Sequence, residues 1–298
     1  MNEPTYAIQT LELTKRYRKH LAVDHLNLQV PTGSVYAFLG RNGAGKTTTI
    51  RMLLNLLDRS SGGVSVLGLD PQRRDFELKK RIGYVAEGQR MYDWMSVAQI
   101  VWFCKGFYPT WDDALAADLT RQMELPAKQK LRNLSRGTQA KVALLLAMAH
   151  RPELLILDEP TAGLDVVVRR EFLEGVIDMI QQEGRTVFFS SHIVHEVERV
   201  ADWVGVLDEG RLIWSGPLDD LKRSVKRLVL TFPDSVPQSL SLDGALSTRI
   251  SGRQATIVVR NHSEAVLQSA HRIAPQVDVE DLPLEDVLVA LLGEGGGR

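Results

Sequence analysis

Eight residues near the N-terminus constrain the fold of this chain more than any other segment. They are Gly40-Arg41-Asn42-Gly43-Ala44-Gly45-Lys46-Thr47. An apolar run at residues 35–39 precedes them, and helical spacing begins near Gly45. A glycine-rich turn between a strand and a helix is typical of α/β folds that hold phosphate groups at a helix N-terminus. At average composition, the four fixed positions would match by chance in about one chain of this length in a hundred.

The residue types of this loop suit the phosphates of a nucleotide. Glycine lets backbone N–H groups turn toward phosphate oxygens, and the helix N-terminus adds positive potential. Lys46 would reach the β and γ phosphates, and the Thr47 hydroxyl would bind Mg²⁺. The alternative is a glycine turn that only caps a helix, but the flanking strand and helix favour the phosphate loop. We expect nucleotide contacts from Gly40, Asn42, Gly43, Ala44, Gly45, Lys46, Thr47 and Thr48.

A second segment supplies two carboxylates. Residues 154–159, Leu-Leu-Ile-Leu-Asp-Glu, form an apolar run that ends in Asp158 and Glu159. At the carboxyl end of a parallel sheet, Asp158 would hold Mg²⁺ through water and Glu159 would act at the γ phosphate as a base or water-orienting group. By itself an acidic strand end is usually only a polar exit from the sheet. Because the chain also contains a phosphate loop, the functional interpretation of Asp158 and Glu159 is favoured over that of a polar strand end.

The order of the remaining segments predicts a doubly wound α/β domain. Short apolar runs at residues 154–157, 186–190 and 203–207 alternate with helical segments, a pattern typical of parallel strands buried on both faces. Earlier β-rich segments lie at residues 6–13, 26–30, 35–39 and 63–67. Helix-like spacing at residues 96–123, broken at Tyr108-Pro109, indicates a helical insertion.

After about residue 224 the pattern changes to that of a small α+β appendage. Residues 226–232 and 255–259 are β-rich, and residues 262–272 and 284–292 have helical spacing. We therefore expect a main domain at 1–224 and an accessory domain at 225–298, with a disordered Gly-rich end at residues 293–298. The last helix has an apolar face that should be buried on the appendage's own sheet, the main domain or a second copy of the chain. Its residues are Leu282, Leu284, Val287, Leu288, Leu291 and Leu292.

Composition favours a protein of the reducing cytosol. Lys plus Arg (36) nearly balances Asp plus Glu (37), so no global field would hold the chain on nucleic acid or an anionic bilayer. Cys104 is the only cysteine, which excludes an intrachain disulfide and a zinc cluster. The N-terminal residues show no secretion signal, and the longest apolar run, residues 142–149, is too short for a membrane span of about twenty residues. If the chain works at a membrane, another chain must span it.

With the phosphate loop and the carboxylates of residues 158 and 159, the sequence resembles the ATP-binding subunits of ABC transporters over residues 5–223. Residues 134–139, Leu-Ser-Arg-Gly-Thr-Gln, look like the family's signature motif, with Arg136 and Thr138 in place of two small residues. Residues 162–165, Ala-Gly-Leu-Asp, resemble the D-loop, and residues 190–192, Ser-Ser-His, the switch histidine. The resemblance implies a P-loop NTPase (RecA-like) core with an antiparallel β subdomain, a helical subdomain at about 92–140 and the C-terminal α+β appendage.

The resemblance also implies roles for single residues in a composite ATP site. Tyr17 occupies the place of the aromatic that stacks on adenine, a use of π surface that needs no base-specific contact. His192 would contact the γ phosphate beside Glu159. Ser135, Gly137 and Gln139 would complete the site of a second cassette paired head to tail, with Asp165 at the same interface. The products would be ADP and phosphate.

One position departs from the family's pattern. Where many relatives carry the glutamine of the Q-loop, after the segment at residues 82–86, this chain has Glu87, with Gln89 two residues later. Glutamate could still reach Mg²⁺ or the attacking water, but it adds negative charge beside the phosphates. We treat Glu87 as the γ-phosphate sensor and a candidate metal ligand, because it stands five residues after Ile82, and Gln89 remains the alternative.

Eight aromatic residues lie between Tyr84 and Trp111, which indicates either the core of the helical insertion or a socket for a partner's helix. Residues 107–112 and the tail from Asp278 resemble the bacterial exporter branch. The expected partners are an integral membrane permease and a second cassette, in a homodimer or heterodimer, with no nucleic acid. The chain would then lie at the cytoplasmic face of the membrane.

Two rival functions belong to other classes. A soluble cassette acting on ribosomes or DNA would usually carry two cassettes or a long coiled coil, and neither pattern is present. A regulatory module that binds nucleotide without turnover would not need Glu159 and His192, and both are intact.

Overall fold

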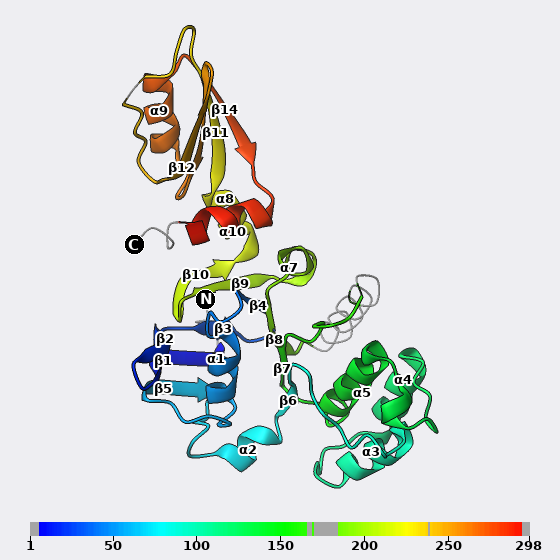
Figure 1. Ribbon diagram of the computed structural model, residues 1–298. Coiled ribbons are helices and arrows are strands. Elements are labelled where there is room, and N and C mark those ends of the chain that lie inside the picture. The colour runs from blue at the N-terminus through cyan, green and yellow to red at the C-terminus, as the bar shows by residue number, and fades with distance from the viewer. Residues whose placement is uncertain (1–5, 166–168, 170–183, 238, 294–298) are drawn as a thin grey trace. The chain divides into compact units, whose positions relative to one another are not determined.

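Buried apolar strands form the central sheet, in the order β10-β9-β4-β8-β7-β6 (Figure 1). The computed structural model describes residues 6–165, 169, 184–237 and 239–293, so the disorder expected at the C-terminal end lies outside the described residues from 294 onward. Strands β4, β6, β7, β8 and β9 run parallel, and β4, β7 and β8 are buried almost throughout, as expected of strands covered on both faces. The strands are β4 (Val35–Gly40), β6 (Ile82–Val85), β7 (Leu154–Asp158), β8 (Thr186–Ser191), β9 (Trp203–Asp208) and β10 (Arg211–Pro217).

The register of this sheet places the ends of three predicted strands beside one another. Leu39 of β4 pairs with Ser191 of β8, and Asp158 of β7 pairs with Ser190. The segments that leave β4, β7 and β8 therefore emerge at one edge, where ligands bind in open α/β sheets. The predicted α/β fold is confirmed.

A second, antiparallel sheet packs in the same unit. Strand β1 pairs with β2, β3 and β5, and its buried residues join one apolar cluster with Phe38 and Phe188 of the central sheet. The strand predicted at residues 26–30 is divided, because β2 ends at Leu26 and β3 begins at Gln29. The strands are β1 (Tyr6–Tyr17), β2 (His20–Leu26), β3 (Gln29–Pro31) and β5 (Ser61–Val66).

The helical insertion contains α3, α4 and α5, which pack through buried residues such as Ile100, Leu119 and Leu144. The break predicted at Tyr108-Pro109 lies between α3 and α4. Ser96 is the N-cap of α3 and forms a capping box with Gln99, and Asp112 is the N-cap of α4. The helices of the first unit are α1 (Lys46–Leu53), α2 (Asp75–Lys79), α3 (Val97–Lys105), α4 (Asp113–Gln122), the 3₁₀ turn Leu131–Asn133, α5 (Arg136–Met148) and α7 (Val194–Val200).

The C-terminal unit has its own antiparallel sheet and core. Strands in the order β12-β13-β11-β14 carry an apolar cluster that includes Leu228, Ile257 and Ala270 of α9. Its elements are α8 (Leu218–Ser224), β11 (Lys226–Thr231), β12 (Ala245–Ser251), β13 (Gln254–Val259), α9 (Glu264–Ile273), β14 (Gln276–Asp281) and α10 (Leu284–Gly293). The apolar face predicted for the last helix is buried at Leu284, Val287 and Leu288.

The chain divides into the units Met1–Ser215 and Gly216–Arg298, so the division falls within β10. The sequence placed it after residue 224, but α8 groups with the second unit. Among the described residues, no helix is both long enough and apolar enough to cross a membrane.

Candidate nucleotide-binding site

The phosphate loop runs from the end of β4 into α1, and two of its glycines are required by the backbone. Gly43 and Gly45 have φ angles of 84° and 107°, in a region that L side chains rarely adopt. A Cβ on Gly45 would also lie 2.4 Å from the carbonyl oxygen of Ala22. Gly45 is the N-cap of α1, whose first N–H groups have no partner within the helix. The loop therefore presents helix N–H groups that suit phosphate oxygens.

Lys46, the first residue of α1, is buried and its ammonium group is held by three oxygens. It donates to the carbonyls of Gly40 (2.8 Å) and Arg41 (3.3 Å) and lies 3.2 Å from Oε1 of Glu159. The contact with Glu159 joins segments more than a hundred residues apart. It places the predicted phosphate-binding cation directly beside the predicted base.

Asp158, at the end of β7, is buried and accepts hydrogen bonds from two hydroxyls. Thr47 Oγ1 lies 3.1 Å from its Oδ1, and Ser190 Oγ donates to the same oxygen at 2.8 Å. Burial raises the pKa of this carboxyl, and the two hydroxyl hydrogen bonds act in the opposite direction. Asp158 and Thr47 thus form an oxygen-lined corner next to the loop.

Glu159 is held in a sparsely populated backbone conformation, with φ of 46°. Such a residue costs on the order of 1–3 kcal/mol and persists only where its surroundings fix it. Its backbone N–H donates to Ser190 Oγ at 2.9 Å, and its Oε2 lies 2.8 Å from Nδ1 of His192. Lys46, Glu159 and His192 therefore form one continuous network at the carboxyl edge of the sheet.

The residues of the signature motif lie apart from this network. Ser135 is the N-cap of α5 and accepts a hydrogen bond from the N–H of Thr138, with Gly137 in the first turn. Gln139 donates to the carbonyl of Leu131 at 3.0 Å. Within the described residues, no hydrogen bond or ion pair joins Ser135, Gly137 or Gln139 to Lys46. The roles given to Ser135, Gly137 and Gln139 in the site of a second cassette stay predictions.

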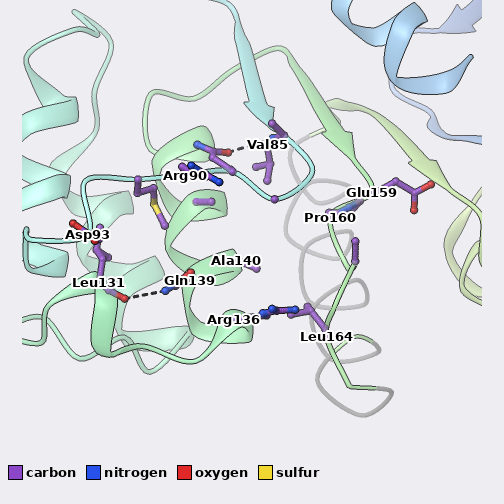
Figure 2. Close-up of a pocket in the computed structure, with 16 residues that line it drawn as sticks. Val85, Arg90, Asp93, Leu131, Arg136, Gln139, Ala140, Glu159, Pro160 and Leu164 are labelled. Carbon is purple, nitrogen blue, oxygen red and sulfur yellow. Dashed lines mark hydrogen bonds between the residues drawn. The ribbon is translucent and has the colours of Figure 1, made fainter. Parts of the chain in front are cut away.

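A cavity of about 680 Å³ lies between α5 and the segment that follows β7 (Figure 2). Arg90, Arg136 and Gln139 line one side, and Pro160 and Leu164 line the other. Glu159 stands at its rim with its carboxylate turned away from Arg136. The described lining includes no residue of the phosphate loop, so this cavity adjoins the site without containing it.

Comparison with known proteins decides the family. The family model described as "ABC transporter" matches residues 23–162. The bacitracin transport ATP-binding protein BcrA of Bacillus licheniformis is 38% identical over 72% of this chain and 71% of its own length. The chain belongs to the ATP-binding proteins of ABC transporters. It binds ATP, and its hydrolysis of ATP is coupled to transport.

Solved cassettes share the fold of the first unit. The ATP-binding subunit of an ABC transporter, 26% identical, matches with a TM-score of 0.66 over 74% of this chain and 92% of its own. A dimeric bacterial ABC transporter cassette, 22% identical, matches with a TM-score of 0.63 over 71% and 98%. The resemblance stated from the sequence motifs is confirmed.

Three further predicted positions of this ABC ATP-binding protein lie at the surface. Tyr17 ends β1 with an exposed ring, and Lys15 Nζ lies 5.1 Å from the ring centroid. Glu87 is exposed in the turn after β6, whereas Gln89 lines the cavity and accepts a hydrogen bond from the N–H of Ala86 at 3.2 Å. Asp165 is exposed, and its carbonyl accepts from the backbone N–H of Arg169. The roles given to Tyr17, Glu87 and Asp165 stay predictions.

Ser190 is a site residue of the cassette that sequence reasoning missed. It was quoted only as part of the motif before His192, yet its buried hydroxyl connects Asp158 with the backbone of Glu159. The available signal was its position at the end of a buried strand, where a polar side chain needs a partner.

We expect Ser190→Ala to destabilise the cassette by about 1–3 kcal/mol, because a buried carboxylate and a buried N–H each lose a partner. Urea denaturation monitored by circular dichroism measures this loss. The control is Ser269→Ala on α9, which removes an exposed hydroxyl that donates to the carbonyl of Ala265 in its own helix. Equal stability of the two variants would show that the Ser190 bridge is not important.

Proposed function

We propose that this chain hydrolyses MgATP at a composite site and thereby powers a separate membrane permease that exports its substrate. The observation that carries the proposal is the network of Lys46, Glu159 and His192 beside the corner formed by Thr47 and Asp158. Lys46 would bind the phosphates, Glu159 would orient or deprotonate the attacking water, and His192 would hold the γ phosphate. Most of the rate enhancement would come from positioning and charge stabilisation.

The residues at the corner fit Mg²⁺. The ion prefers hard oxygen ligands and usually takes one or two carboxylates together with substrate phosphates. Asp158 is a buried carboxylate whose hydrogen-bonding partners in the structure are hydroxyls, so a cation would compensate a charge that burial disfavours. We propose that Thr47 and Asp158 hold the ion, which would neutralise phosphate charge, and that Glu87 contributes from the surface turn.

The second half of the site would come from another cassette. The start of α5 offers the Ser135 hydroxyl and the Gly137 N–H at a helix N-terminus, which suits a phosphate. Because these groups lie apart from Lys46 in the same chain, we infer a head-to-tail dimer in which they meet the partner's γ phosphate. The dimeric state of the 22% identical bacterial cassette supports this arrangement.

The docking surface for the permease would be the aromatic patch of Tyr92, Trp94, Trp102, Phe103 and Phe107. Ring contacts connect four of them, with centroids 6.2 Å apart for Tyr92–Trp94, 5.6 Å for Tyr92–Phe103 and 5.2 Å for Phe103–Phe107. Tyr92, Trp94, Trp102 and Phe107 are 52%, 56%, 76% and 63% exposed, so these four rings do not belong to the core of the helical insertion, whereas Phe103 is partly buried. Exposed aromatic clusters of this kind mark binding sites for other proteins.

Transport is favoured over action on ribosomes or DNA, because the name of the similar Bacillus protein concerns bacitracin transport. We infer the outward direction from the resemblance of residues 107–112 and of the tail to exporter-type chains.

We expect the double variant Trp94→Ala/Phe107→Ala to hydrolyse ATP at the basal rate but to lose its membrane partner. The two rings belong to the exposed patch and not to the nucleotide network, so only docking should suffer. The measurement is phosphate release by the purified chain, together with affinity purification of the tagged chain from detergent-solubilised host membranes and mass spectrometry of the bound proteins.

The matched control is Phe76→Ala, which removes another exposed ring, on α2, outside the patch. If the double variant recovers the same membrane protein as the unchanged chain, the patch is not the docking surface. If the unchanged chain recovers ribosomal proteins or nucleic acid and no membrane protein, the rival function replaces this one.

A further inference from the structure

Glu196 is a buried carboxylate behind the nucleotide network to which the proposed mechanism gives no part. It lies on α7, four residues after His192, and is 9% exposed. A buried carboxylate is costly unless it is paired and hydrogen-bonded, so its partners indicate what it is for.

The partners of Glu196 come from the segment that follows Glu159. The Thr161 hydroxyl donates to Oε2 of Glu196 at 3.1 Å, and Nε of Arg169 lies 3.2 Å from Oε1. Thr161 is two residues after Glu159, and Arg169 is four residues after Asp165. One carboxylate therefore holds both sides of the loop formed by residues 161–165, here called the 161–165 loop.

Further hydrogen bonds support this arrangement. Nη2 of Arg169 donates to the carbonyl of Leu164 at 2.9 Å, and the N–H of Leu164 donates to the carbonyl of Thr161 at 3.1 Å. The loop is also tied to the base, because the N–H of Ala162 donates to the carbonyl of Glu159 at 3.0 Å. A shift of Glu196 would thus be transmitted to the backbone of Glu159.

The charges near Glu196 are balanced only in part. Burial raises the pKa of Glu196, the Thr161 hydrogen bond and Arg169 lower it, and nearby Glu159 raises it again. Arg169 lies in direct contact with the Glu196 carboxylate, so the arginine and the Thr161 hydroxyl compensate part of the cost of its burial.

We propose that Glu196 is a positioning residue that clamps the 161–165 loop to the helix following His192, and so fixes the spacing of Glu159 and His192. Thr161 follows Glu159 by two residues, and Glu196 follows His192 by four. The clamp therefore joins the two segments that carry the 2.8 Å contact between Glu159 and His192. Because Asp165 ends the same loop, the clamp also sets how the chain meets a second cassette. The inference rests on the roles proposed above for Glu159 and His192.

The test compares Glu196→Ala, Glu196→Gln and Thr161→Val in steady-state phosphate release with varied MgATP. We expect kcat to fall about tenfold to a hundredfold in Glu196→Ala, since misplacement of reacting groups by about 1 Å costs on that order. KM and the nucleotide affinity should stay within about threefold, because Lys46 and Thr47 are untouched. Glu196→Gln keeps an acceptor for the Thr161 hydroxyl and should recover part of kcat.

The control is Glu153→Ala, which breaks an ion pair with Arg81 (2.5 and 2.7 Å) at the opposite end of β7. It should lower the melting temperature without lowering kcat. Thr161→Val, which keeps the side-chain shape, covers the case in which Glu196→Ala does not fold. A double-mutant cycle of Glu196→Gln with Thr161→Val should be non-additive in kcat.

An unchanged kcat in folded Glu196→Ala or in Thr161→Val would overturn the proposal, and so would additive effects in the cycle. Glu159→Gln, measured in the same assay, distinguishes failure of the role proposed for Glu159 from failure of the clamp. If Glu159→Gln retains turnover, the role of Glu159 fails. If it loses turnover while the Glu196 and Thr161 variants do not, only the clamp fails.

Discussion

Glu159→Gln is expected to reduce turnover of MgATP about a hundredfold or more while nucleotide binding persists. Removal of a general base typically costs 10²–10⁴ in rate, roughly. Glutamine keeps the shape and an oxygen acceptor for Lys46, so the phosphate loop remains intact. The variant should accumulate as an ATP-bound dimer, which sedimentation with and without ATP would detect beside phosphate release.

A matched control for this variant is Glu124→Gln. Glu124 also has a positive φ, 53°, but is exposed after α4, away from the nucleotide network. It should keep normal turnover. Near-normal phosphate release by Glu159→Gln would remove Glu159 from its proposed role.

Lys46→Ala is expected to weaken ATP binding rather than only the chemical step. A hydrogen bond to a charged group contributes about 1.5–3 kcal/mol, or roughly tenfold to a hundredfold in affinity. The change also leaves the buried Glu159 carboxylate without its cation, so a moderate loss of stability should accompany it. Titration with a fluorescent ATP analogue measures the affinity.

Lys79→Ala is the control for Lys46→Ala, since Lys79 forms a surface ion pair with Asp75 on α2. It should bind nucleotide normally, because exposed pairs contribute little. An unchanged affinity in Lys46→Ala, with the fold intact, would contradict the phosphate-binding role of this lysine.

The sequence predicted those elements that a short stretch of residues determines, namely the phosphate loop and the buried strands. The glycines at 43 and 45 have the backbone angles that a phosphate loop requires, and the strands before Gly40 and Glu159 lie where the apolar runs predicted them. The contact of Lys46 with Glu159 could be expected only from the order of parallel strands, because it joins distant segments.

Other features had no usable signal. Strands β12 and β14 are edge strands with mostly exposed residues. The residues of β12 do not alternate, and the alternation in β14 rests on two valines, Val277 and Val279, which is too short a pattern to distinguish this strand from a loop. Glu196 is one acidic residue on a helix, where the usual expectation is a solvated side chain. Its burial depends on Thr161 and Arg169, which no sequence pattern connects with it.

The strands β4, β8 and β7 that support the nucleotide network are adjacent in one parallel sheet. Their backbone hydrogen bonds fix the spacing between Lys46, Asp158 and the segment before His192, so these groups cannot separate while the sheet is intact. With the composite site proposed above, the arrival of a second cassette would decide when ATP is consumed. Turnover would then be controlled by the pairing of two cassettes, and so by their abundance and their assembly on one surface.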